Sequence, residues 1–349
     1  MMRLGDDALM RQGPGGPSDP SRHGQLGVST SGQGAGAGGS TGAAVQARRL
    51  TKRFGDFTAV DAVDFDIHVG EAFGFLGANG AGKTSTMRMI ACLSPISGGT
   101  LQVLGLDPMR DGPQIRSRIG LVPQEDTLTL NLELTVRDNL YLYGRYFGLP
   151  KKQLRERVEE LLEFARLTER ADERVDPLSG GMRRPLTIAR ALVSSPSLVI
   201  LDEPTTGLDP QARHLLWDRL YRLKREGVTL VITTHYMDEA EQLCDRLVVM
   251  DAGRIAAAGS PRELIEQWST REVVELRFEP EGHQVHGDRL ADLAQRVEVL
   301  PDRLLLYTDE GDATLDAVRS RGASPIAALV RRATLEDVFL HLTGRSLVD

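Results

Sequence analysis

The sequence has little of what a secreted, membrane-spanning or metal-clustered chain requires. Only two of its 349 residues are cysteine, Cys92 and Cys244, which are too few and too far apart for a metal cluster or a disulfide framework. No stretch approaches the roughly 18 consecutive apolar residues that span a bilayer. Asp6 and Asp7 stand where a secretion signal has its apolar core. We therefore expect a cytoplasmic chain.

Positive charge is also in short supply. The 42 lysines and arginines are outnumbered by 49 acidic residues, which leaves a formal net charge of -7. A polyanion would be repelled unless the chain carried a local basic patch, and we find none in the sequence. We therefore expect no nucleic-acid partner. The 41% hydrophobic and 26% charged residues are ordinary for a globular protein, and the length favours two or three domains.

Composition and periodicity divide the chain into three parts. Residues 1–44 are dominated by Gly, Ser, Pro and Gln, which predicts a disordered tail with either a passive or a regulatory role. Residues 45–269 mix strand and helix patterns, with a helical subdomain expected at about 125–178. Two apolar runs in this part, 198–201 and 228–232, are typical of strands buried on both faces of a parallel sheet.

The third part, residues 270–349, shows short strand patterns and short helical patterns. It predicts a small α+β accessory domain. Its last helix should start at Thr334, a residue type that caps helices, and stop at Gly344.

One glycine-rich loop fits the phosphate-binding pattern G-x-x-x-x-G-K-[ST], and it lies between a predicted strand and a predicted helix, as that motif requires. Glycines let backbone amides turn toward phosphates, Lys83 can neutralise the β and γ oxygens, and Thr84 can offer its hydroxyl to Mg²⁺. The loop predicts a phosphate site for a nucleotide such as ATP with Mg²⁺, and by itself it leaves kinases, GTPases and many ATPases open. The nucleotide-binding residues expected here are Gly77, Ala78, Asn79, Gly80, Ala81, Gly82, Lys83, Thr84 and Ser85.

Two acids and a histidine follow the buried strands. Asp202 can hold Mg²⁺ through water, and Glu203 can polarise the attacking water as a general base. His235 follows the second apolar run and can contact a γ-phosphate. Together with the loop, these residues predict nucleotide hydrolysis.

A second phosphate cradle occurs at Leu178-Ser179-Gly180-Gly181-Met182, where a hydroxyl and two glycines stand at a predicted helix start. Because Lys83 already serves one set of phosphates, a second cradle suggests a site shared between two copies of the chain.

In this order and spacing, the motifs resemble the ABC ATPase family over residues 45–269. The resemblance implies an α/β fold: a P-loop NTPase of ABC type with a parallel-sheet core, an antiparallel β subdomain and a helical subdomain. It also implies a homodimer of ATPase subunits. For single residues it implies that Phe54 stacks on adenine and that Gln124, in Val122-Pro123-Gln124, contacts Mg²⁺ or water and senses a membrane partner. By the same resemblance, Ser179 and Gly181 bind the γ-phosphate of the opposite copy and Asp209 links the two sites.

Further stretches resemble exporters of the daunorubicin-resistance and nodulation-factor type, namely 144–148, 161–167, 233–241 and 335–345. They imply a separate ABC-2 type permease, a peripheral position on the cytoplasmic face of the cell membrane, and an amphipathic cargo. That cargo would be a hydrophobic antibiotic or a lipid-linked saccharide.

Three features depart from the family pattern. Ala78 replaces a common proline, residues 128–133 form a longer stretch than the pattern leads us to expect, and Pro185 stands where a basic residue is expected.

Two other hypotheses about the function of the chain stay open. One is a non-transport ABC protein acting on ribosomes or DNA, which would have tandem ATPase units or long heptads that this chain lacks. The other is a regulatory subunit that binds nucleotide without turnover. Pro185 leaves room for this second reading, and the intact Lys83, Asp202, Glu203 and His235 oppose it.

Overall fold

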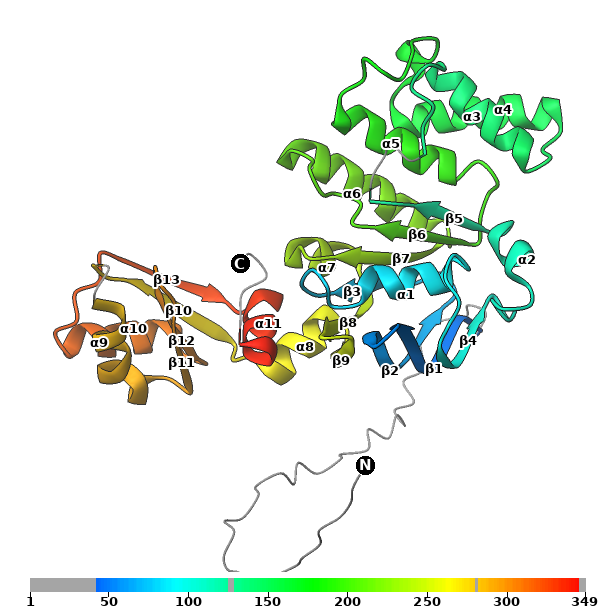
Figure 1. Ribbon diagram of the computed structural model, residues 1–349. Helices are drawn as coiled ribbons and strands as arrows, with labels where there is room; N and C mark the ends of the chain where they lie inside the picture. Colours follow the sequence, from blue (N-terminus) through cyan, green and yellow to red (C-terminus); the bar gives the residue numbers. More distant parts are fainter. Residues whose placement is uncertain (1–41, 125–128, 280–281, 345–349) are drawn as a thin grey trace, which may run out of the picture. The chain divides into compact units, whose positions relative to one another are not determined.

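A computed structural model describes residues 42–124, 129–279 and 282–344 of the protein (Figure 1). The expectations for residues 1–41, 125–128 and 345–349 lie outside these residues. The first described strand, β1, spans Ala43–Phe54 and begins two residues before position 45, where we expected the ATPase region to start. Ala44 is only 1% exposed, and its carbonyl accepts a hydrogen bond from the Leu104 amide at 2.7 Å. Alanine belongs to the same small-residue composition as the tail, so the sequence did not mark this boundary.

The core is a six-stranded sheet in the order β5-β6-β7-β3-β8-β9. All its pairings are parallel except that of β8 with β9. Every residue of β3, β6 and β7 is buried, as expected for strands covered on both faces. The strands are β3 Ala72–Leu76, β5 Ile119–Val122, β6 Leu198–Asp202, β7 Thr229–Thr234, β8 Arg246–Asp251 and β9 Arg254–Gly259.

The register of this sheet gathers the candidate residues at one edge. Leu76 at the end of β3 pairs with Thr234 at the end of β7, and Asp202 at the end of β6 pairs with Thr233. Because parallel strands end on the same side, the segments that follow these three strands meet there.

A three-stranded antiparallel sheet, β2-β1-β4, provides the expected β subdomain. Phe65 of β2 packs edge to face against Phe75 of β3, with ring centroids 5.1 Å apart, so the two sheets share one apolar cluster. The remaining elements of this region are β2 Phe57–His68, β4 Gly98–Val103, α1 Lys83–Ile90 and α2 Gly112–Arg116.

Helices dominate the segment between β5 and β6. The helix α4 spans Lys151–Ala165, within the expected helical subdomain, and buries one apolar face, with Leu154, Val158 and Leu162 in the main core cluster. No described helix is long and apolar enough to cross a membrane. The other helices of the ATPase region are α3 Val136–Tyr146, the 3₁₀ turn η2 Thr168–Arg170, α5 Gly180–Ala191, α6 Pro210–Arg225, α7 Met237–Leu243 and α8 Pro261–Trp268.

The C-terminal region contains a second antiparallel sheet in the order β11-β12-β10-β13. Val274, Leu276 and Leu306 on one face of this sheet form a separate small core with residues of α9 and α10. These elements confirm the predicted α+β fold of the region. They are β10 Glu272–Arg277, β11 Arg296–Val299, β12 Leu304–Thr308, β13 Ala327–Arg332, α9 Gly282–Leu290, η3 Ala291–Leu293 and α10 Gly311–Ser320.

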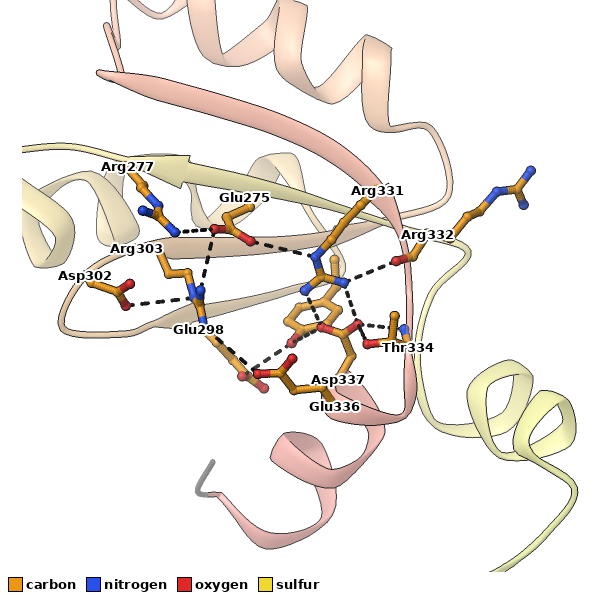
Figure 2. A network of polar contacts seen from close by, with 11 residues as sticks. Glu275, Arg277, Glu298, Asp302, Arg303, Arg331, Arg332, Thr334, Glu336 and Asp337 are labelled. Carbon is orange, nitrogen blue, oxygen red and sulfur yellow. Dashed lines mark hydrogen bonds and ion pairs between the residues drawn. The ribbon is translucent and has the colours of Figure 1, made fainter. Parts of the chain in front are cut away.

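The last helix, α11 Leu335–Thr343, joins the two regions. It starts after Thr334 and ends at Gly344, as predicted. Leu335, Val338 and Phe339 are fully buried in the core cluster of the ATPase region, so α11 does not belong to the accessory region alone. On its other side, Asp337 accepts hydrogen bonds from Arg331 of β13 and from the Tyr307 hydroxyl of β12, within the polar network in Figure 2.

Candidate active site

The glycine-rich loop connects the end of β3 to the start of α1. Gly80 and Gly82 have φ values of 83° and 101°, which side chains with a Cβ rarely adopt. A Cβ atom at Gly77 would lie 2.4 Å from the Met250 carbonyl oxygen, and one at Gly82 would lie 2.5 Å from that of Ala59. Gly80 and Gly82 are therefore required by their backbone conformation. Gly77 and Gly82 are required because there is no room for a side chain at either position.

Lys83 is buried at the base of this loop. Its Nζ donates to the carbonyl oxygens of Gly77 at 2.7 Å and Ala78 at 3.1 Å, and it lies 3.7 Å from Oε1 of Glu203. Burial lowers the pKa of Lys83, while the carboxylates of Glu203 and Asp202 oppose that shift. The arrangement fixes an ammonium group where phosphate oxygens would need a donor.

A cavity of about 430 Å³ opens over the loop, a size within the usual range for ligand sites. Phe57, the first residue of β2, lines this cavity, whereas Phe54 is not among its lining residues. Phe54 lies instead with the Lys52 ammonium 4.8 Å from the centre of its ring. The adenine contact of Phe54 therefore stays a prediction. The lining residues are Phe57, Ala59, Asn79, Gly80, Ala81, Gly82, Lys83, Thr84, Ser85, Gln124 and Glu203.

Oxygen atoms suited to Mg²⁺ lie beside the loop. The Thr84 hydroxyl donates to Oδ1 of Asp202 at 3.3 Å, and the Thr233 hydroxyl donates to the same oxygen at 2.5 Å. Hydroxyl and carboxylate oxygens are ligands that Mg²⁺ accepts, and it usually completes its shell with water and phosphate oxygens. The residues present therefore fit a metal ion that arrives with a nucleotide.

Glu203 is the centre of the cluster of candidate catalytic residues. It has a φ of 46°, a left-handed conformation that is uncommon for a residue other than glycine and is often found at functional sites. Its Oε2 accepts hydrogen bonds from Gln124 Nε2 at 3.0 Å and from the Thr206 hydroxyl at 3.1 Å. The Nδ1 atom of His235 lies 3.3 Å from the same oxygen. Three residues predicted to act in catalysis therefore meet at one carboxylate.

The surroundings keep this carboxylate ionised. Contact with His235 is the largest influence that lowers the pKa of Glu203, and Lys83 and the Thr206 hydroxyl act in the same direction. Burial opposes them without reversing the shift. An ionised carboxylate that reaches into the cavity can accept a proton from a water molecule.

The signature residues form a separate surface of the same chain. Ser179 is the N-cap of α5, but its exposed side chain makes no capping hydrogen bond to the helix. Ser179, Gly180 and Gly181 are absent from the lining of the cavity over the phosphate loop. Asp209 caps α6, where its carboxylate accepts a hydrogen bond from the Ala212 amide at 2.8 Å. The intermolecular roles of these four residues stay predictions.

Comparison with known proteins decides the family. The model of the ABC transporter family matches residues 60–206, and the model described as nodulation factor export protein NodI, C-terminal domain, matches residues 281–344. Nod factor export ATP-binding protein I of Cupriavidus metallidurans is 48% identical over 310 residues, which cover 88% of this chain and 99% of that protein. This chain is an ABC transporter ATP-binding protein. Proteins of this family hydrolyse ATP to power transport, so the chain is an ATPase that binds ATP.

Solved structures agree with this assignment. The chain resembles cbiO1 from Clostridium perfringens, part of the ABC transporter complex cbiONQ, with a TM-score of 0.60 and 29% identity over 64% of this chain and 91% of that one. It also resembles the ATP-binding cassette MJ0796, in a dimeric post-hydrolysis state bound to ADP and Pi, with a TM-score of 0.57 and 26% identity. That match covers 62% of this chain and 98% of MJ0796. The predicted fold class is confirmed.

Sequence reasoning missed several contributors to this ATPase site. The Thr206 hydroxyl donates a hydrogen bond to Glu203, and the Thr233 hydroxyl donates one to Asp202. Both threonines lie near the ends of β6 and β7, a position that could have indicated hydrogen-bond donors to the acids. Phe57 gave no motif signal. Arg184 lies in α5 and donates hydrogen bonds to the backbone carbonyls of Pro123 and Glu203. No pattern in the sequence indicates these contacts.

Proposed function

We propose that this chain energises export of an amphipathic compound through a separate ABC-2 type permease, as a peripheral subunit on the cytoplasmic face of the cell membrane. The observation that carries this proposal is the similarity to Nod factor export ATP-binding protein I, which extends over the ATPase region and the C-terminal region alike. The name of that relative, an export protein, supports the direction of transport. For the cargo, we propose a hydrophobic antibiotic or a lipid-linked saccharide.

The proposed working form is a homodimer that encloses ATP between two copies. This proposal is supported by the signature residues Ser179 and Gly180, which are exposed and do not line the phosphate-loop cavity of their own chain. In the dimer, the loop amides and Lys83 of one copy hold the phosphates while Ser179 and Gly181 of the other copy contact the γ-phosphate.

Mg²⁺ would be held by Thr84 and, through water, by Asp202, with Gln124 in reach. When bound, it supplies charge neutralisation for the phosphate oxygens. Glu203 orients a water molecule and accepts its proton, and His235 is placed beside it to contact the γ-phosphate. Closure of the dimer completes this arrangement and excludes bulk water.

Glu203→Gln tests the catalytic part of the proposal. The amide keeps the shape of the side chain but cannot accept the proton, so we expect retained ATP binding and a loss of about 10²- to 10⁴-fold in turnover. Dimers should accumulate with ATP and Mg²⁺ on size-exclusion chromatography. The matched control is Glu226→Gln, an exposed glutamate after α6, which should behave as the parent chain does. A Glu203→Gln protein that stays monomeric with ATP and Mg²⁺ would contradict the shared site.

Reconstitution tests the transport part. ATP turnover is measured for the purified chain with and without an ABC-2 permease in liposomes, together with ATP-dependent movement of a labelled lipid-linked saccharide or a hydrophobic antibiotic. We expect the permease to stimulate turnover and one cargo class to move. Absence of turnover even with the permease would support the regulatory-subunit reading, and turnover without movement of either class would contradict the proposed cargo.

A further inference from the structure

Arg184 lies on the signature helix α5, five residues after Ser179, and its side chain points into the protein. It is only 3% exposed. Among the described residues, its guanidinium group donates five hydrogen bonds to backbone carbonyl oxygens. These are Nε to Pro204 at 2.7 Å, Nη1 to Pro123 at 2.6 Å and to Gln124 at 3.3 Å, and Nη2 to Asp202 and to Glu203, both at 3.1 Å.

These acceptors come from two segments that are far apart in the sequence. Pro123 and Gln124 follow β5, whereas residues 202–204 are the end of β6 and the turn after it. A guanidinium presents five N–H donors in a rigid plane, so one side chain can hold both segments in a fixed relation. Arg184 therefore links the signature helix to the backbone of Gln124 and to that of Glu203.

The backbone of Glu203 needs such support because its φ of 46° is unfavourable for a residue with a Cβ. On one side, its amide donates to the Thr233 hydroxyl at 3.0 Å. On the other side, its carbonyl accepts from Arg184. The side chain of Gln124 touches the Glu203 carboxylate while the carbonyl of Gln124 is bonded to the same guanidinium.

We propose that Arg184 is a positioning residue for ATP hydrolysis, which ties the position of the signature helix to the orientation of Gln124 and Glu203. The inference rests on the proposed homodimer, in which Ser179 meets the nucleotide of the other copy. Movement of α5 during closure is then transmitted through one side chain to the backbone of the catalytic carboxylate. Pro185 has no hydrogen-bond donor in its side chain or its backbone, so the neighbouring position offers no substitute.

Arg184→Lys tests this role. Lysine keeps the positive charge but has three donors on a single nitrogen, so at least two of the five hydrogen bonds are lost. We expect kcat to fall at least tenfold while the affinity of the monomer for ATP stays within twofold of the parent, because the phosphate loop is untouched. In the Glu203→Gln background, Arg184→Lys should also weaken ATP-dependent dimerisation.

Arg183→Lys is the matched control, since Arg183 is the preceding residue on α5 and bonds to the Asp176 carbonyl outside the catalytic centre. It should leave kcat and dimerisation unchanged. If Arg184→Lys does not fold, Arg184→Gln, which keeps a planar donor group, is judged by the same measurements.

Three results would overturn the inference: an unchanged kcat, a loss of ATP affinity in step with kcat, or failure of both variants to fold. The last two would make Arg184 a purely structural residue. The parent chain in the same assay separates this inference from the proposed function, because an inactive parent contradicts hydrolysis itself, whereas an active parent with an equally active Arg184→Lys contradicts only the positioning role.

Discussion

Replacement of Pro185 by alanine should stabilise the protein. Pro185 lies inside α5, six residues beyond the N-cap Ser179, and it is buried. There it has no amide to donate to the Gly181 carbonyl, and its ring crowds that turn. Proline costs about 3 kcal/mol relative to alanine in a regular helix interior. An arginine would be a poor test at this position, because its charge would have to enter the core.

The expected gain is smaller than the full helix penalty. Alanine gives up two ring methylenes of a buried side chain, which lowers the gain by about 0.8 kcal/mol for each methylene. The net stabilisation is then about 1.4 kcal/mol, which raises the melting temperature by roughly 3–6 °C for a region of this size. If the proline also bends the first turn of α5 away from a second copy, the maximal ATPase rate should rise, with the ATP affinity of the monomer unchanged.

Thermal melting followed by circular dichroism, with and without ATP, measures this effect. Pro210→Ala is the matched control, because Pro210 is the first residue of α6 and a proline is harmless there. It should not raise the melting temperature. An unchanged or lowered melting temperature for Pro185→Ala would refute the reasoning, because it would show that α5 accommodates the proline ring without the expected strain.

The remaining predictions concern other parts of the chain. Asp337→Asn removes the nearer of the two carboxylates paired with the half-buried Arg331 and leaves Glu275, 3.7 Å away, as its remaining ionised partner (Figure 2), so stability should fall by about 1.5–3 kcal/mol. The pKa of Asp337 is lowered in the folded chain, so its ionised carboxylate stabilises the parent protein at pH values above the ordinary aspartate pKa. This stabilisation is lost as the pH falls through the lowered pKa. The melting temperature of Asp337→Asn should not show this loss. Thr206→Val removes a donor that helps lower the pKa of Glu203, so the acid limb of kcat should move to higher pH; an unchanged profile would exclude Glu203 as its source. The protein that lacks residues 1–44 should have a melting temperature about 2–4 °C below that of the protein that lacks residues 1–41, because it loses the hydrogen bond of the buried Ala44. Equal melting temperatures would place the start of the fold after Ala44.

The parts of the fold that sequence predicted are those with local patterns. Continuous apolar runs marked β6 and β7 because both faces of these strands are covered. The phosphate loop was identifiable because its glycines meet a local backbone requirement. Once the strands were known to be parallel, the meeting of Asp202, Glu203 and His235 at one edge followed from strand direction alone.

The parts that sequence did not predict depend on tertiary contacts. The apolar face of α11 indicates that the helix packs against something, but periodicity does not say which core receives it. In the structure, Leu335 and Phe339 enter the ATPase core, and the Leu335 amide donates to Glu241 of α7 at 2.7 Å. Phe57 likewise carries no motif, and only the hairpin between β1 and β2 brings it to the cavity.

The signature helix shows how a departure from a family pattern can mislead when it is read alone. Pro185 suggested a subunit that binds nucleotide without turnover, since a basic residue was expected there. The structure places the Glu203 carboxylate in contact with Gln124 and His235 by interactions that do not involve residue 185. The backbone around that carboxylate is bonded to Arg184, one position earlier. We therefore expect Pro185 to act through the stability and shape of α5, and Arg184 to act on the backbone around Glu203; the Pro185→Ala and Arg184→Lys variants separate these two effects.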